Sequence, residues 1–311
     1  MIVMVWLPLL VPFLAGPAGR RLVSCLPPRQ AAWLLAVTAA GLAAGSTAAL
    51  TLLVVPGATH LPAVAALGRL LTPLSTGSAD AVVAVAVAAL ALLLLCAALF
   101  VRGLHRRWTQ LGRAKRLAAR ADGELLVLAD EFPDAYALPG RPGRIVVTAG
   151  MLRALSAAER EALFAHERAH LRGRHHLFTA VTELSALCHP ALGALREPLA
   201  YALERCADEA AAHAVGDRRL TAQAIGRAAL AARGAARRPD LALAATAGPV
   251  PRRVAAHLAP ATPAPRTPPN PGLAIAAALL TCLTLSATAA LEAATDLHTN
   301  IEVAQGELHS P

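Results

Sequence analysis

The chain has 311 residues, of which 56% are hydrophobic and only 16% are charged, and its mean hydropathy is +0.51. Soluble globular domains average about 25% charged residues, so this composition excludes an ordinary soluble protein. The formal net charge is +9, but only 3% of the residues are aromatic. Nucleic-acid-binding surfaces combine basic with aromatic side chains, so direct nucleic-acid binding is not expected.

Four apolar runs indicate membrane spans. A bilayer core of about 30 Å needs about 20 helical residues, and residues 31–55, 81–101 and 272–291 reach that length without a charged residue. The run 1–16 is shorter, but its nearest positive charges, Arg20 and Arg21, follow it. A signal peptide carries positive charge before its apolar stretch, so we interpret this run as a first span. About four transmembrane helices are therefore predicted.

The positive charges of the short loops predict the orientation. Residues 17–30 carry three arginines and no acid, and residues 102–120 carry seven basic residues and no acid. Such loops stay in the cytoplasm, so residues 102–270 are expected there, with the N-terminus and a short tail, 292–311, on the outside. The sequence thus predicts a multi-pass protein of the cell membrane whose first partner is the lipid bilayer.

The cytoplasmic region reads as a mixed domain. Glu124–Ala129 and Arg144–Thr148 have strand composition and are separated by a turn-rich stretch. Ser156 and Glu159 have the spacing of a capping box, which predicts the start of a helix. We expect helices over about 157–174, 176–187 and 197–215, the last closed by Gly216. The predicted domain covers 102–232, and a linker rich in proline and alanine, 233–271, leads to the fourth span.

The segment His166-Glu167-Arg168-Ala169-His170 is an H-E-x-x-H motif in the second half of the capped helix. Residues four apart share one helical face, so His166 and His170 can bind one zinc ion, while Glu167 is left to act as a base toward water. A catalytic zinc site also needs a third protein ligand. The motif therefore predicts a zinc peptidase and leaves its third ligand to be found.

Two residues compete for the third position. His176 would complete the metzincin pattern H-E-x-x-H-x-x-G-x-x-H, but metzincins also need a methionine turn downstream, and the three methionines are Met1, Met4 and Met151. Glu204 is the preferred candidate. Asp208 lies four residues later on the same helical face, where it would accept an N–H from a ligating imidazole.

With these residues the sequence resembles the integral-membrane gluzincins over residues 120–215, with the segment Arg253–Leu258 as a candidate extension. The resemblance rests on Asp134–Gly140 (DAYALPG), the strand-then-glycine stretch Ile145–Leu152, the HERAH helix, His189-Pro190 and the E-x-x-A-D segment at 204–208. The chain is similar to the HtpX-like and CAAX-prenyl-protease-like peptidases, and its order of spans is more similar to the BlaR/MecR-like antirepressor peptidases. The resemblance implies one Zn²⁺ per chain, bound by His166, His170 and Glu204, with Glu167 as the catalytic base.

The fold class expected is a mainly α integral membrane protein with a cytoplasmic α+β zinc-peptidase domain and a small edge sheet. The expected function is zinc-dependent endopeptidase activity on a cytoplasmic or membrane protein, with a transcriptional repressor in a signalling pathway as one substrate. Antirepressor sensors carry an extracellular penicillin-binding domain, whereas about twenty residues follow Leu291 here, so direct β-lactam sensing is not expected. The alternatives are a quality-control protease of the HtpX type and a non-enzymatic zinc-containing signalling protein.

The strand Arg144–Thr148 is expected to offer an unpaired edge on which a substrate peptide adds as a further strand. A second donor for the oxyanion is not identified by the sequence. Tyr136, Tyr201 and His213 are candidates, each with a structural role as the simpler interpretation.

Overall fold

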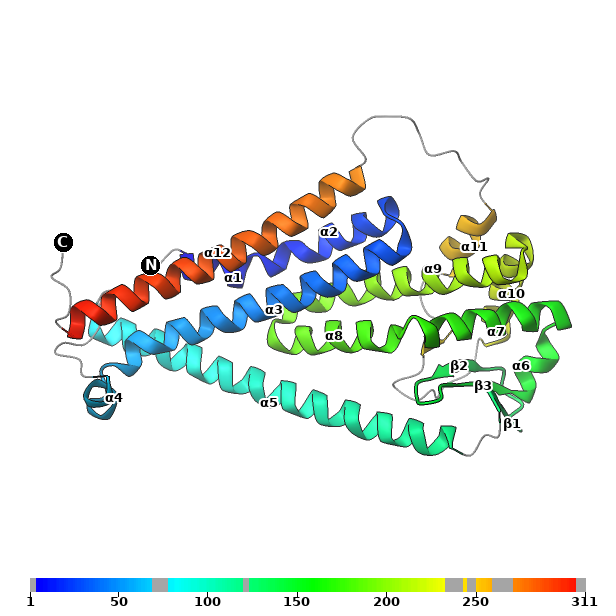
Figure 1. Cartoon of the computed structure of the whole chain (residues 1–311), viewed down its shortest axis with the longest axis horizontal. Helices are drawn as coiled ribbons and strands as arrows, with labels where there is room; N and C mark the ends of the chain where they lie inside the picture. Colours follow the sequence, from blue (N-terminus) through cyan, green and yellow to red (C-terminus); the bar gives the residue numbers. More distant parts are fainter. Residues whose placement is uncertain are drawn as a thin grey trace.

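The computed structural model describes residues 4–68, 78–119, 123–232, 243–244, 250–258 and 271–305. Long helices and a small sheet make up this part of the chain, as the fold class predicted (Figure 1). The molecule is elongated, with the long helices α3 (Pro28–Ala58), α5 (Ala79–Ala118) and α12 (Pro271–Gln305) extending toward one end and the sheet lying at the other.

Among the described residues, three helices are long and apolar enough to cross a membrane. They are α3 (Pro28–Ala58), α5 (Ala79–Ala118) and α12 (Pro271–Gln305). Each contains one of the predicted spans and continues beyond it. α5 runs on through the basic stretch after Val101 without a break, and α12 extends through most of the predicted tail. Residues 306–311 of that tail lie outside the described residues.

The first apolar run is not one of these three long helices. It forms η1 (Met4–Trp6), α1 (Leu7–Leu10) and α2 (Pro12–Cys25), with Pro8 and Pro12 at the starts of the two α-helices and Pro17 inside α2. Proline lacks the N–H that continues a helix, which explains the division into short pieces. That this segment spans the bilayer remains a prediction.

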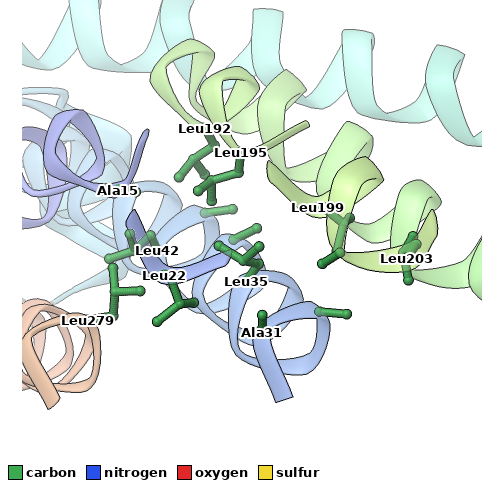
Figure 2. Packing of buried hydrophobic residues seen from close by; sticks show 14 residues of the cluster. Ala15, Leu22, Ala31, Leu35, Leu42, Leu192, Leu195, Leu199, Leu203 and Leu279 are labelled. Atoms are coloured by element: carbon green, nitrogen blue, oxygen red, sulfur yellow. The ribbon is translucent and has the colours of Figure 1, made fainter. Parts of the chain in front are cut away.

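One apolar cluster joins the membrane-type helices to the rest of the molecule (Figure 2). α2, α3 and α12 contribute Leu22, Leu35 and Leu279, while η2 (Pro190–Leu195) and α9 (Arg196–Val215) contribute leucines from the opposite side. The latter are Leu192, Leu195, Leu199 and Leu203, and each is at most 2% exposed. The start of α9 is therefore fixed against the helices that precede the predicted peptidase domain.

The sheet has the strand order β1-β3-β2-β4. β3 (Arg144–Thr148) pairs in parallel with β1 (Leu125–Leu128) and antiparallel with β2 (Ala135–Leu138). The prediction that Arg144–Thr148 offers an unpaired edge is therefore wrong. The strand is central, and Ile145, Val146 and Val147 are fully buried, as expected for an apolar run covered on both faces.

The missing strand lies in the stretch that sequence analysis interpreted as turn. β2 is only four residues long between Pro133 and Pro139, and it lies between β3 and β4. Its outer side carries β4 (Leu243–Ala244), which pairs antiparallel with Tyr136 and Ala137. The side of β2 that faces away from β3 therefore accepts a further strand, and β4, two residues long, occupies it.

Shorter helices follow β3 along the chain. α6 (Ala149–Ala154) follows β3, α7 (Ala157–Arg172) begins at the predicted capping box, and α8 (His175–Cys188) leads back toward α5. α9 ends at Gly216, whose φ of 71° is a left-handed conformation that glycine adopts without strain. α10 (Arg218–Ala231) and α11 (Val250–Leu258) were not expected from the sequence.

α11 changes the interpretation of the predicted linker 233–271. Residues 233–242, 245–249 and 259–270 lie outside the described residues, but 250–258 form a helix that packs on α10. This helix buries Arg253 and His257. Part of the segment interpreted as linker is therefore folded onto α10.

Candidate metal centre

α7 presents the H-E-x-x-H motif from its second half. The helix begins with a complete capping box, in which Ser156 accepts from the Glu159 N–H and Glu159 accepts from the Ser156 N–H. His166 and His170 lie one turn apart, and both rings are buried against α9. α9 brings Glu204 to the same place, and its carboxylate is 1% exposed.

The three predicted ligands form one compact group. Nε2 of His166 lies 3.0 Å from Nε2 of His170, and the Glu204 oxygens lie 3.6 Å and 3.5 Å from these two nitrogens. Four ligands bound tetrahedrally to zinc at about 2.0–2.1 Å would be about 3.3 Å apart. The spacing of the donor atoms and their two-imidazole, one-carboxylate chemistry therefore fit a zinc ion.

The charge around the group also suits a divalent cation. Glu167, Glu204 and Asp208 face a single buried guanidinium, that of Arg253. Burial opposes protonation of His166, but the neighbouring Asp208 and Glu204 carboxylates outweigh it and raise the pKa of His166 to about 10. Carboxylates that favour a proton on this ring would equally favour a metal cation beside it.

Asp208 lies behind the first histidine. Its Oδ1 is 3.0 Å from Nδ1 of His166, on the side of the ring opposite Nε2. A carboxylate at this place fixes which ring nitrogen carries the proton and leaves the other nitrogen for a metal. Burial opposes ionisation of Asp208, yet the hydrogen bonds with Arg253 and His166 lower its pKa. Asp208 is therefore an ionised hydrogen-bond acceptor.

Arg253 of α11 connects the two acids of α9. Its Nε donates to Oδ2 of Asp208 at 2.8 Å, and its Nη1 lies 2.8 Å from Oε2 of Glu204. The arginine is fully buried, and such a charge is tolerated inside a protein only when it is paired. Because Arg253 holds one oxygen of Glu204, the other remains directed toward His170.

Glu167 is buried and fully shielded from solvent. Neither carboxylate oxygen has a hydrogen-bond partner within the part of the chain that the structure describes. Burial raises the pKa of Glu167 to about 8, against the opposing charge of His166 and the nearby backbone N–H of Ala137 in β2. A buried, unsatisfied carboxylate between the histidines and the edge strand is placed to exchange a proton with a bound reactant.

His175 is a contact of the site that the sequence did not indicate. Its Nδ1 lies 2.7 Å from Nδ1 of His170, again on the side of the ring opposite Nε2, the nitrogen that faces Glu204. Arg174 adopts a left-handed conformation, φ 50°, between α7 and α8, and this turns His175 back under α7. Burial, followed by the charges of His166 and His176, lowers the pKa of His175 to about 4, so the ring is neutral and carries one nitrogen able to accept a hydrogen bond.

The remaining sequence candidates lie elsewhere. Among the described residues, the metal-type group consists of His166, His170 and Glu204, and His176 is not part of it. Tyr136 packs into an apolar cluster with residues of α5, Tyr201 lies under the Arg252 guanidinium at 4.3 Å, and His213 is exposed.

Sequence reasoning missed the roles of Arg253 and His175 for different reasons. Asp208 and Arg253 are separated by 45 residues, and no spacing rule links side chains of two helices that lie so far apart in the sequence. His175 lies only five residues after His170, but its position depends on the left-handed turn at Arg174.

A family model described as peptidase family M48 matches residues 101–196, just under a third of the chain. The match contains the H-E-x-x-H helix and ends before Glu204. It supports an M48-family metallopeptidase, a class that generally uses zinc, and it indicates protease activity with peptide substrates. No curated protein and no solved structure matches the chain significantly.

Proposed function

We propose that this M48-type chain is a membrane-embedded zinc metalloendopeptidase of the gluzincin class, H-E-x-x-H plus glutamate. One observation carries the proposal: donor atoms of His166, His170 and Glu204 converge within 4.8 Å of one another, with the unsatisfied carboxylate of Glu167 beside them. A purely structural zinc site would have a fourth protein ligand and no use for such a base.

The proposed roles follow from these positions. Zinc bound by the three ligands would supply a Lewis acid that polarises the scissile carbonyl and activates water. Glu167 accepts a proton from the attacking water as its oxygen bonds to the carbonyl carbon, and then delivers that proton to the amide nitrogen as the C–N bond breaks. Asp208 and His175 hold the two imidazoles, and Arg253 holds Glu204.

A substrate would bind to β2. Its outer edge already accepts β4 in an antiparallel register, and Ala137 in the middle of β2 is the residue whose backbone N–H lies near Glu167. An extended peptide could replace β4 on this edge, and its backbone would then run past the proposed base. This mode of binding supplies affinity through main-chain hydrogen bonds and leaves specificity to the neighbouring side chains.

The substrate is proposed to be a cytoplasmic or membrane protein. This rests on the positive charges of residues 17–30 and 102–120, which favour a cytoplasmic central region. A transcriptional repressor is the more specific proposal, because the order of spans is similar to that of the BlaR/MecR type. A quality-control protease would instead generate many products from damaged membrane proteins.

The proposal is tested by comparing newly formed protein N-termini in membranes and cytosol of cells that express wild type or Glu167→Gln. Glu161→Gln is the matched control, because Glu161 is an exposed glutamate on the same helix. We expect a set of N-termini that wild type and Glu161→Gln share and Glu167→Gln lacks. Identical N-termini for wild type and Glu167→Gln would contradict peptidase activity and favour a non-enzymatic signalling protein.

A further inference from the structure

A strongly basic cavity lies next to the proposed substrate edge. It has a volume of about 760 Å³ and is enclosed by the end of α5, the turn between β2 and β3, and the junction of α7 and α8. Lys115, Arg141, Arg144 and Arg174 line it together with His176, and its lining residues include no aspartate or glutamate. Burial and the charges of Arg174 and Arg107 lower the pKa of His176, as expected in a region of positive potential.

Close packing fixes the walls of this cavity. The β2–β3 turn lies against the end of α7, where a Cβ at Gly143 would be 3.0 Å from Cδ2 of Leu171. On its other side, Arg144 Nε donates to the carbonyl oxygen of Ala118 in α5 at 3.4 Å. The cationic side chains of Lys115, Arg141 and Arg174 are exposed on these walls, so their charges face solvent that an approaching ligand can replace.

The register of the sheet connects the cavity to the reaction site. β4 runs antiparallel to β2, with Leu243 opposite Ala137. In a substrate with the same direction, the residues N-terminal to the one opposite Ala137 continue past Leu138 toward Pro139 and Gly140, which line the cavity. At about 3.3 Å per extended residue, the third residue before that point lies about 10 Å along the strand, at the mouth of the cavity.

Two other classes of anion fit the site less well. Lys115 lies 14 residues beyond Val101, which places it about 21 Å along α5 from the end of the apolar run and past the usual depth of lipid headgroups. The lining residues are aliphatic, small or basic, and none is a phenylalanine, tyrosine or tryptophan on which a nucleic-acid base could stack. An acidic peptide segment can bind here without a lipid headgroup layer at the level of the cavity and without an aromatic side chain to stack on.

We propose that this cavity is a specificity subsite that binds acidic side chains of the substrate, about three to five residues N-terminal to the scissile bond. The inference rests on the proposed peptidase function and adds a substrate class to it. Lys115, Arg141 and Arg174 supply the attraction, and the β2–β3 turn guides the chain from the edge strand into the cavity. Substrates with aspartate or glutamate at these positions bind more tightly and are cleaved faster.

The test uses the full chain in phosphatidylcholine nanodiscs and three peptide mixtures, each with a degenerate six-residue core preceded by three aspartates, three asparagines or three lysines. Cleavage positions are read by mass spectrometry. Binding of the same mixtures is measured on Glu167→Gln, so that a failure of turnover and a failure of the subsite give different results. A second set, with the three residues after the core, tests the direction of binding.

The triple variant Lys115→Glu, Arg141→Glu, Arg174→Glu is compared with Arg113→Glu, Arg116→Glu, Arg219→Glu, which changes charge equally at exposed arginines that do not line the cavity. We expect wild type and the control variant to prefer the preceding aspartates over asparagines by about tenfold, since each exposed pair contributes modestly. The preference should fall in 1 M salt and reverse in the cavity variant.

Equal binding of the three mixtures to Glu167→Gln would overturn the subsite, whatever the cleavage result. So would a preference that the cavity variant retains, or one that appears only when the aspartates follow the core. Loss of the preference in nanodiscs that contain phosphatidylglycerol would assign the cavity to lipid headgroups and would also contradict the proposal. Absence of cleavage with an intact aspartate preference in binding would count against the peptidase function alone.

Discussion

His175 illustrates how one buried side chain can hold a metal ligand in place. Its Nδ1 is 2.7 Å from Nδ1 of His170. When Nε2 of His170 binds the metal, Nδ1 of that ring carries the proton and would donate it to neutral His175. Truncation to alanine would free the ring to rotate. Such contacts behind a ligand typically contribute about 10- to 100-fold to metal affinity.

We therefore expect His175→Ala to weaken zinc binding by about 10- to 100-fold, measured by competition with a chromophoric chelator. His175→Asp restores an acceptor for the His170 proton and should recover much of this loss. His176→Ala is the control, because His176 is not part of the metal-type group. Equal zinc affinity for wild type and His175→Ala would show that His170 is oriented without this contact.

Arg253 is the buried charge on which two acids of α9 depend. Its replacement would leave Asp208 and Glu204 facing each other in a site that excludes water. Removing one partner of a buried ion pair typically costs about 3–5 kcal/mol. Arg253→Met should lower the free energy of unfolding by this order, whereas Arg252→Met, which loses the contact with the Tyr201 ring and an exposed hydrogen bond to Ser24, should cost much less.

Thermal unfolding in detergent, followed by near-UV circular dichroism, would measure the difference. A similar midpoint for Arg253→Met and Arg252→Met would mean that the Asp208 and Glu204 carboxylates do not need the guanidinium.

At the residue scale, the sequence predicted the groups linked by helical spacing, His166 with His170 and Glu204 with Asp208. The two partners contributed by other elements could not be predicted, because their positions depend on tertiary packing.

At the scale of single elements, the start of α7 was predicted correctly from the capping box. Glu159 there is nearly fully buried and also pairs with Arg227 of α10 at 2.8 Å. Burial opposes its ionisation, but the hydrogen bonds from Ser156 and the charge of Arg227 outweigh it and lower the pKa of Glu159 below 4.5. Its stabilising contribution is therefore present above pH 4.5 and is lost as the pH falls through the lowered pKa.

Glu159→Ala should destabilise the protein by about 1 kcal/mol at pH 7, and this deficit should narrow as the pH falls below 4.5. Glu161→Ala, at an exposed position of the same helix, should change stability little at either pH. Chemical unfolding at several pH values measures both. A deficit for Glu159→Ala that is constant between pH 7 and pH 3 would contradict the ionised capping box.

The sheet shows where prediction from local sequence ended. Arg144–Thr148 and its neighbour β1 were both recognised as strands, but β2 was not, because it is short and lies between two prolines. A strand's place in a sheet depends on partners that are distant in sequence. The continuous apolar run Ile145–Val147 was the available sign in the sequence that this strand is central, and its residues are fully buried.

At the scale of the whole molecule, the three long apolar helices were predictable because span length and hydropathy are properties of the sequence alone. The contact of α3 with α9 was not. Leu199 and Leu203 of α9 belong to the same apolar cluster as Leu35 of α3 (Figure 2), and Glu204 directly follows Leu203. The helix that carries Glu204 is therefore supported directly by α3, one of the three long apolar helices.

This arrangement predicts that residues 102–258 will not form a stable zinc-binding unit alone. Without α2 and α3, the buried face of Leu192, Leu195, Leu199 and Leu203 would be exposed to solvent. Burying each such side chain contributes about 1.5–3 kcal/mol, so the loss from four of them, about 6–12 kcal/mol, is as large as the whole stability of a typical domain. We expect the fragment to aggregate or to resist proteolysis poorly; a soluble, protease-resistant fragment that binds one zinc would contradict this view.

The most direct test of the metallopeptidase assignment is zinc content measured together with peptide cleavage on one purified, full-length preparation. We expect one zinc per chain in wild type, one zinc without cleavage in Glu167→Gln, and neither zinc nor cleavage in Glu204→Ala. His176→Ala should retain its zinc. Full zinc and full cleavage in Glu204→Ala, or undiminished cleavage in Glu167→Gln, would contradict the account.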